Sequence, residues 1–488
     1  MLLGDTQGTG VRKAMSARFV SRRSVILAGL AGVGASLLAA CGAAAPTPTA
    51  APAKPAAAVA TSAPAAAATT APAAAKPATS AAGKTTIRYT YDETPGEKEW
   101  HGKVKPDYEK AHPNIELQPE PTVDKWVEKT IAGLVAGTAP DMLLAFGDIV
   151  SRFASRGAFV DVTEIAKGWG ADYDLNDVFP AALKESQVKA AQFALPYCYD
   201  PVSIFFFRKS LFDEAKVGYP DDKWTYDDFQ KDNVALTKKD ASGKVVQWAY
   251  NGAESIADWG YVRLYPAIWA FGGDKYNPDM TKCLLAEPEA MKAITMYYDL
   301  KWKANSSPTP QDVGKLSYYQ MFASGQCAMQ TTGPWAISTY REMIKDDKIK
   351  NDWEVGPPPN GPKGRFVLAA ANHWGVNKDS KARDATAELL RYLTDKERAK
   401  ELGKIGRRVP ARKSAGGSFI DSNRPENQKV FPDSLAYARS DQIHPTQEGK
   451  IADVLTAAWQ QIILLNKGTP EQILPDAVKK VDALLKEG

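Results

Sequence analysis

The sequence predicts an α/β fold built as two lobes, and three observations support this prediction. Strand-like and helix-like stretches alternate through residues 85–488, an order typical of sheets that are covered by helices. Residues 141–146, DMLLAF, form a short, almost continuous apolar run, which is typical of a strand buried on both faces of a parallel sheet. The alternating region spans about 400 residues, more than a single hydrophobic core organises, so its length predicts two lobes.

The first elements follow the chain from residue 85. Thr85–Tyr91 is expected to be a strand, and apolar side chains at helical spacing predict a helix from Trp126 to Gly137. After the strand at 141–146 comes Asp148, at a position where open α/β sheets bind ligands. Asp148 is therefore a candidate binding carboxylate. A helix N-cap explains it as well, and both interpretations remain open.

The middle of the chain carries scaffold signals. Leu195–Pro201 contains two prolines that fix an extended path suited to a crossover between lobes, and an apolar strand is expected at Val202–Phe207. Thr225 with Asp228 resembles a capping box ahead of a helix, and Pro288 opens another helix.

Two more strands are expected towards the C-terminus. Gln326–Thr332 ends in the turn Gly333-Pro334-Trp335, and Ala369–Val376 precedes Ser380, which is expected to cap a helix that runs through Leu393.

Six aromatic residues fall at predicted strand ends or in loops. A sugar ring packs its C–H groups on an aromatic face, while its hydroxyls need carboxylates, amides or Arg around the rim. Core packing explains any single one of the six as well, but the Gly-Pro turn before Trp335 directs that indole away from the sheet. The six are Tyr197, Tyr199, Trp259, Trp269, Trp335 and Trp374.

The charge distribution argues against a nucleic-acid-binding domain. Eight of the 61 Lys and Arg residues and one of the 57 Asp and Glu residues precede residue 85, which leaves 53 basic and 56 acidic residues in 85–488. The densest basic run, Arg407–Lys413, is short, and we interpret it as a solvated or hinge-proximal cluster.

The cysteines and histidines predict neither a disulfide framework nor a metal site. Besides Cys41 there are Cys198, Cys283 and Cys327, without Cys-x-x-Cys spacing. A Cys283–Cys327 bridge and three buried thiols both remain open. The four histidines stand singly, so no metal and no cofactor is expected.

Residues 1–84 have the organisation of an export signal and a tether. Basic residues precede an apolar segment shorter than the ~20 residues that cross a bilayer. The ending Leu38–Cys41 resembles a bacterial lipobox, which implies cleavage before Cys41, its lipidation, and an extracytoplasmic, membrane-anchored protein. Ser21–Leu27 resembles a twin-arginine signal, but paired arginines also occur in ordinary secretory signals, so both routes remain open. Residues 42–84 are mostly Ala, Pro, Thr and Ser, which predicts a disordered tether.

Ten short motifs follow one another in residues 85–488: HPNIEL at 112–117, WVEK at 126–129, LVAGTAPD at 134–141, GAFVDVT at 157–163, ALPY at 194–197, WTYDDF at 224–229, FGGD at 271–274, FASGQCAM at 322–329, GPW at 333–335 and VNKDSK at 376–381. In this order and spacing they resemble extracellular solute-binding proteins of ABC importers, of the carbohydrate-binding class that includes maltose-binding protein.

The resemblance implies a type II periplasmic-binding-protein fold whose two lobes close on a ligand in the cleft between them. One lobe is expected to comprise residues 85–197 and about 367–437, and the other about 205–360 and 440–488. The resemblance also implies a monomer without enzymatic activity that binds a sugar or oligosaccharide and docks on membrane permease subunits.

Particular site residues can be carried over from the family. Trp335 matches the stacking Trp that follows Gly-Pro, and Asp148 matches a carboxylate shortly after the Ala-Pro-Asp strand. Asp200 falls near a polar position of the first interlobe crossing, where the spacing differs by one residue. Trp269 and Trp374 are candidates for the pocket wall by position, with lobe packing as the open alternative.

Three competing interpretations remain. A lipid-anchored glycoside hydrolase also needs aromatic residues and a carboxylate pair about 5 to 10 Å apart in a cleft. A polyol or a glycerol-phosphate-like solute fits the same scaffold, because fold likeness does not define a ligand. A structural envelope protein would have no small ligand and no lobe closure.

Overall fold

The structure is a computed structural model that describes residues 83–122, 125–252, 262–314, 316–346, 349–421 and 423–487. The side chains of Pro95, Asp148 and Val262 lie outside this description. The same is true of the predicted export signal, of Cys41, of residues 42–82 of the predicted tether, and of Trp259.

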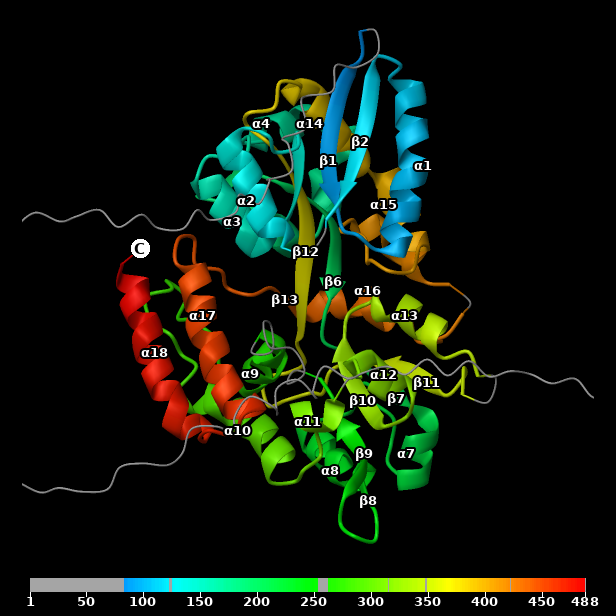
Figure 1. Cartoon of the computed structure of the whole chain (residues 1–488), viewed down its shortest axis with the longest axis vertical. Helices are drawn as coiled ribbons and strands as arrows, with labels where there is room; N and C mark the ends of the chain where they lie inside the picture. The colour runs from blue at the N-terminus through cyan, green and yellow to red at the C-terminus, as the bar shows by residue number, and fades with distance from the viewer. Residues whose placement is uncertain are drawn as a thin grey trace, which may run out of the picture. The chain divides into compact units, whose positions relative to one another are not determined.

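The first lobe is built on a six-stranded sheet (Figure 1). Its strands follow the order β13-β12-β3-β1-β2, and β6 pairs with β12. β1 runs parallel to β2 and β3, whereas β12 runs antiparallel to β3 and β6. The strands are β1 (Thr85–Tyr91), β2 (Ile115–Pro121), β3 (Met142–Phe146), β6 (Leu195–Pro201), β12 (Val367–Val376) and β13 (Ala438–Arg439).

Helices cover this sheet from both sides, with α1 and α15 on one side and α2 and α3 on the other (Figure 1). A small hairpin of β4 (Gln187–Val188) and β5 (Ala191–Gln192) lies outside the sheet. The helices are α1 (Pro95–Ala111), α2 (Trp126–Ala136), α3 (Gly147–Ser155), α4 (Thr163–Gly168), α5 (Gly170–Tyr173), α6 (Pro180–Glu185), α14 (Arg383–Leu393), α15 (Lys396–Lys404) and α16 (Val430–Ser434), with 3₁₀ turns at Leu175–Asp177, Lys413–Phe419 and Leu435–Tyr437.

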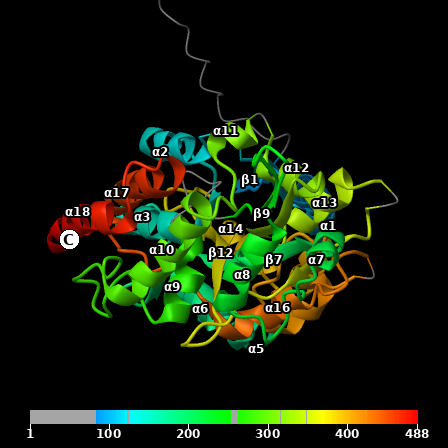
Figure 2. The ribbon, with the colours of Figure 1, turned by 90° about the horizontal axis from the view of Figure 1, so that it is seen from below.

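The second lobe has a five-stranded sheet in the order β11-β7-β10-β9-β8. Seen from below, α8 lies against this sheet, and α17 and α18 lie side by side at one edge (Figure 2). Its strands are β7 (Ile204–Arg208), β8 (Lys238–Lys239), β9 (Val245–Tyr250), β10 (Cys327–Thr332) and β11 (Trp353–Gly356). Its helices are α7 (Lys209–Ala215), α8 (Tyr226–Leu236), α9 (Tyr265–Phe271), α10 (Pro288–Trp302), α11 (Pro310–Val313), α12 (Tyr318–Ala323), α13 (Ala336–Met343), α17 (Glu448–Trp459) and α18 (Pro470–Lys486), with a 3₁₀ turn at Val262–Leu264 and a π turn at Gln460–Leu464.

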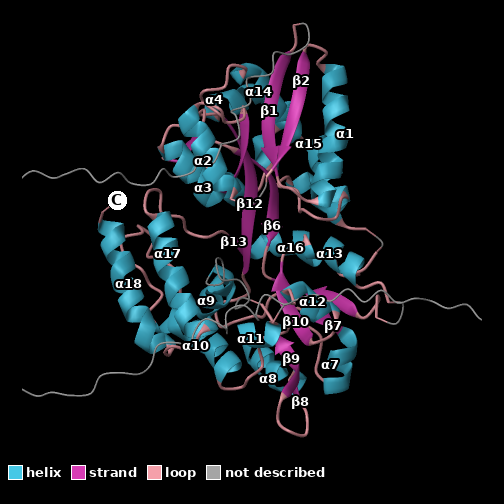
Figure 3. Ribbon diagram, in the orientation of Figure 1, coloured by secondary structure: helices cyan, strands magenta, loops and turns pink. Residues whose placement is uncertain are grey.

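Three segments of the chain cross between the two lobes. β6 leads into β7, β11 leads into β12, and β13 leads into α17. The long strands β6 and β12 reach from the first lobe toward the second (Figure 3). A hydrophobic cluster that includes Tyr199, Phe206 and Ala369 draws on both sheets. The two-lobed α/β architecture confirms the fold class that the sequence predicts.

Most element boundaries agree with the expectations, and three differ for identifiable reasons. β7 starts at Ile204, because the backbone N–H of Val202 and the Ser203 hydroxyl instead bond with Leu368 of β12. α14 starts at Arg383, because the Ser380 hydroxyl donates to Asp141 and accepts from the N–H of Ala382 rather than capping the helix.

The third difference concerns Asp148. The N-cap position of α3 belongs to Phe146, so Asp148 is the second helical residue and the N-cap interpretation is wrong.

The structure distinguishes between a Cys283–Cys327 disulfide and three buried thiols. Cys198, Cys283 and Cys327 are free, buried thiols, so a Cys283–Cys327 bridge is absent. Across the described residues, no helix combines the length and the apolar character that a membrane span requires.

Candidate ligand-binding site

A cavity of about 720 Å³ lies between the two lobes. Its walls come from the ends of β1, β3 and β6, from the middle of β12, and from loops and helices of the second lobe. This is the region where open α/β sheets place ligands, and its volume lies in the range of sites for small molecules. It is lined by Asp92, Phe146, Gly147, Arg152, Glu185, Asp200, Val202, Arg263, Tyr319, Trp335, Leu368, Ala369, Ala370, Ala371, Asn372, Arg407, Arg408, Asp441, Ile443, Glu448, Gly449, Ala452 and Asp453.

Arg408 organises one side of this cavity. Its guanidinium donates to Glu97 and to Asp200 at 2.8 Å each and also pairs with Asp92. Arg408 is only 6 % exposed. Asp200 further accepts a 2.8 Å bond from the backbone N–H of Val409. One arginine thus holds three carboxylates, from the end of β1, from α1 and from the crossing strand β6.

The pKa shifts in this network follow from burial. Burial raises the pKa of both Glu97 and Asp200, and the Arg408 charge offsets only part of that rise. Burial alone would lower the pKa of Arg408, but the carboxylates of Glu97 and Asp200 hold it well above its ordinary value. The Tyr197 hydroxyl, which donates to Glu97, also has a raised pKa, first through burial and then through the Glu97 charge.

Trp335 comes from the second lobe, just before α13, and lies beside this network. The centroid of its ring lies 5.9 Å from the Arg408 guanidinium, and its indole N–H donates to the Tyr319 hydroxyl at 2.8 Å. Because the indole N–H is already bonded, the ring is held in place, and it forms part of the cavity wall.

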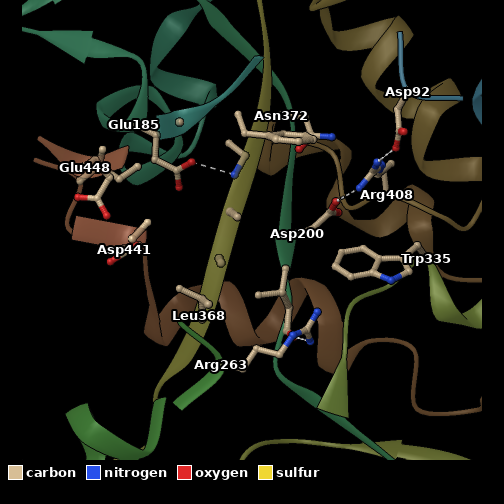
Figure 4. A pocket seen from close by; sticks show the side chains of 18 of the residues that line it. Asp92, Glu185, Asp200, Arg263, Trp335, Leu368, Asn372, Arg408, Asp441 and Glu448 are labelled. Carbon is tan, nitrogen blue, oxygen red and sulfur yellow. Dashed lines mark hydrogen bonds and ion pairs between the residues drawn. The ribbon is translucent and has the colours of Figure 1, made fainter. Parts of the chain in front are cut away.

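Carboxylates gather on the other side of β12 (Figure 4). Glu185 accepts from the Ser440 hydroxyl at 2.5 Å and from the N–H of Ala371 at 2.9 Å. Asp441 and Glu448 both pair with Lys275, which is buried behind them. Burial works against the Lys275 charge, but these two carboxylates contribute to a pKa well above the ordinary value. The cavity therefore has an acidic side and an opposite side where Trp335 lies beside Arg408 and the carboxylates that Arg408 neutralises.

The structure brings two of the predicted site residues, Asp200 and Trp335, to the cavity. Both carboxylate oxygens of Asp200 already accept hydrogen bonds, one from Arg408 and one from the backbone N–H of Val409. Asp148 is the second residue of α3 and follows the cavity-lining Gly147; its side chain lies outside the description, as does the whole of Trp259.

Three predicted pocket residues lie elsewhere. Trp374 is fully buried in the first lobe, 4.1 Å from the Tyr197 ring between centroids, and its N–H donates to Thr90. Trp269 packs under Arg439 at 4.5 Å and donates to Asp274. Tyr199 is buried and bonded to Ser440. For these three, core packing replaces the expected place in the pocket wall.

The interpretation of the basic run as solvated is wrong for Arg408 and Arg412, whereas Lys413 is exposed. Besides Arg408, Arg412 is only 1 % exposed, and it lies over the Tyr173 ring at 4.4 Å. The sequence marks these residues as unusual, because they form the densest basic run of a net acidic domain. It does not reveal their carboxylate partners, which are distant in sequence. No cluster of three His, Cys, Asp or Glu side chains that could hold a metal occurs among the described residues.

Comparisons with known proteins agree with this geometry. The family model described as bacterial extracellular solute-binding protein matches residues 91–400. A putative binding protein of Brucella abortus is 25 % identical over 388 residues, 79 % of this chain and 89 % of that protein. A maltodextrin-binding protein of Bacillus subtilis is 23 % identical over 417 residues, 83 % of this chain and 91 % of that one.

Solved structures show the same fold. An ABC substrate-binding protein of Listeria monocytogenes, in complex with cycloalternan, has a TM-score of 0.72 at 22 % identity, covering 83 % of this chain and 99 % of that one. A receptor of Streptomyces glaucescens, solved unliganded and with acarbose, has a TM-score of 0.69 at 19 % identity, again with 83 % and 99 % coverage.

Proposed function

Because this chain belongs to the bacterial extracellular solute-binding proteins, we propose that it binds a sugar or oligosaccharide between its lobes and delivers it to the permease of an ABC importer. The observation that carries this proposal is the cavity of about 720 Å³ with the Trp335 ring in its wall. An aromatic face matches the C–H groups of a sugar ring, and the surrounding carboxylates, arginines and Asn372 match its hydroxyls. The ligands named for the Bacillus and Listeria relatives, maltodextrin and cycloalternan, support the same class.

The proposal includes the lobes and their movement. One lobe comprises residues 85–197 and about 367–437, and the other about 205–360 and 440–488. Ligand contacts from both lobes favour the closed state, which the permease subunits recognise on a monomer. Asp148 serves as a further ligand carboxylate, and the protein catalyses no reaction on its ligand.

The test is thermal unfolding of the purified protein with mono- and oligosaccharides, polyols and sugar phosphates, together with product analysis of the same samples. At 100 times Kd a ligand stabilises the protein by about 2.7 kcal/mol, which shifts the midpoint by a few degrees. We expect a selective shift without product. Product formation would favour a glycoside hydrolase. A shift caused by polyols alone would indicate that the ligand is a polyol and not a sugar. The absence of any shift would contradict small-molecule binding.

Replacing Trp335 with alanine is expected to weaken sugar binding by about 1–3 kcal/mol, because stacking and apolar burial are lost. Calorimetric titration with the ligand identified above measures the effect. Trp335→Phe keeps an aromatic face and should retain most of the affinity. Unchanged binding in Trp335→Ala would exclude the stacking role.

We also propose that Cys41 is lipidated and anchors the protein outside the cytoplasm, after export by the twin-arginine route and at the end of a tether formed by residues 42–84. Cells that express the protein are expected to incorporate labelled palmitate into it, and Cys41→Ala should abolish that label, because the lipobox thiol is the acceptor. Label that persists in Cys41→Ala protein would contradict the anchor.

A further inference from the structure

Two arginines in the cavity wall, Arg263 and Arg407, have a buried Nε–H without an acceptor and no carboxylate partner among the described residues. Arg263 donates from Nη1 to the carbonyl oxygens of Val202 at 2.9 Å and Thr331 at 3.5 Å, and its buried Nε–H has no acceptor. The Nε–H of Arg407 is likewise buried without an acceptor. Both side chains line the cavity.

The two buried cations of this region, Arg408 and Lys275, are neutralised. Arg408 is held by three carboxylates and Lys275 by two, and the pKa of each is raised well above its ordinary value despite burial. For Arg263 and Arg407 burial is the largest influence, and it leaves their pKa below the ordinary value. Asp92 and Glu97 act on Arg407 in the opposite direction, but burial and the neighbouring Arg408 charge outweigh them.

A partly buried guanidinium without a counter-charge is unfavourable, because arginine remains protonated at any physiological pH. An anion that enters the cavity relieves this cost, since the planar fork of arginine matches a carboxylate or phosphate group. Among the described residues, the cavity therefore contains two cationic donors without a carboxylate partner, and an oxyanion would satisfy both.

The two arginines come from different lobes, so an anion that binds both of them would favour closure of the lobes. Arg263 comes from the turn before α9 in the second lobe, whereas Arg407 follows α15 of the first lobe. Both interact electrostatically with Tyr319, whose hydroxyl holds the Trp335 indole. Figure 4 places Arg263 and Trp335 away from the carboxylates of Glu185, Asp441 and Glu448. The carboxylates that lie on the same side as Trp335, Asp92 and Asp200, are paired with Arg408, which reduces their repulsion of an anion.

We propose that the solute is an acidic saccharide whose carboxylate or phosphate group is held between Arg263 and Arg407 while a sugar ring lies on Trp335. This inference rests on the proposed function and narrows its ligand class. The neutral hydroxyls of such a ligand face the acidic side of the cavity, and its anionic group joins the two lobes.

Calorimetric titration of the full protein with matched ligands tests the inference. The pairs are trigalacturonate against maltotriose, and glucose 6-phosphate against glucose, each at 50 and 300 mM NaCl. We expect one acidic ligand to bind at least tenfold more tightly than its neutral counterpart, with affinity falling as salt rises because ions screen the contact. The pair that shows the preference identifies a carboxylate or a phosphate.

The variants Arg263→Gln and Arg407→Gln are each expected to lower the affinity for that acidic ligand at least tenfold while changing the neutral ligand less than threefold. Arg391→Gln is the matched control, because Arg391 pairs with Glu388 on the first lobe and does not line the cavity. If a Gln variant does not fold, the titrations of the unaltered protein with the acidic and neutral ligands still test whether it prefers an acidic saccharide.

The outcomes separate the two proposals. Neutral saccharides that bind as tightly as acidic ones would overturn the acidic ligand and leave the proposed function intact. An acidic preference that survives in both Gln variants would overturn the role of the two arginines. Failure of every saccharide to bind would overturn both proposals.

Discussion

Replacing Arg408 with alanine is expected to lower the free energy of unfolding by about 3–5 kcal/mol, because it removes the counter-charge of a buried network. Three carboxylates, Asp92, Glu97 and Asp200, then face one another across the base of the cleft without their cation. Glu97 and Asp200 are almost fully buried, so water cannot replace the lost hydrogen bonds. Urea unfolding, followed by circular dichroism, measures the loss.

The loss is expected to grow as pH rises. Burial already raises the pKa of Glu97 and Asp200 in the intact protein. A carboxyl group with a raised folded-state pKa contributes stability below its unfolded pKa, and that contribution is lost as pH rises through the folded value. Without Arg408 these two pKa values rise further. Between acid and neutral pH the variant therefore loses more free energy of unfolding than the unaltered protein does. The deficit at pH 7.5 should therefore exceed the deficit at pH 4.5.

Arg391→Ala provides the matched control, since Arg391 forms a partly exposed pair with Glu388 on α14. Such pairs contribute about 0–1 kcal/mol, so this variant should unfold almost as the unaltered protein does. A loss below about 1 kcal/mol in Arg408→Ala, or a loss independent of pH, would contradict the description of Arg408 as the counter-charge of this cleft.

The fold could be predicted because its signals are local. Gly137 ends α2 in the left-handed conformation that glycine adopts readily. Thr225 and Asp228 form the expected capping box, with reciprocal bonds of 3.1 Å. Each of these features depends on residues within one helical turn. The alternation of such elements was therefore sufficient to predict the α/β class.

The site could be predicted only where its signals were equally local. Trp335 lies in the cavity wall, as the Gly-Pro turn before it predicts. Arg408 escaped prediction because its partners lie 208 to 316 residues earlier in the chain. Trp374 was assigned to the pocket from its position in the second crossing, but neighbouring side chains on one strand point to opposite faces, and position alone does not reveal which face borders the cleft.

The connections between the lobes also carry ion pairs that no local pattern indicates. Arg439 of β13 pairs with Asp274 and lies over Trp269, and two residues later Asp441 pairs with Lys275. The crossing from β13 to α17 is thus fastened to the second lobe at two points.

Replacing Trp374 with alanine is expected to lower the free energy of unfolding by about 3–5 kcal/mol, the usual effect of removing a large buried aromatic side chain. Its ring stacks on Tyr197 at 4.1 Å and on Trp100 at 6.2 Å, and its N–H donates to the Thr90 carbonyl at 2.9 Å. Truncation leaves a cavity among these rings and an unpaired carbonyl. Urea unfolding at pH 7.5 measures the effect.

Ligand affinity per folded molecule should change less than about twofold in Trp374→Ala, because the side chain is fully buried and is not part of the cavity wall. Trp335→Ala should show the reverse pattern, with a large loss of affinity and a smaller loss of stability. If Trp374→Ala protein remained folded and lost as much affinity as Trp335→Ala, Trp374 would belong to the binding surface after all. The two variants together therefore separate packing from recognition for side chains of identical chemistry.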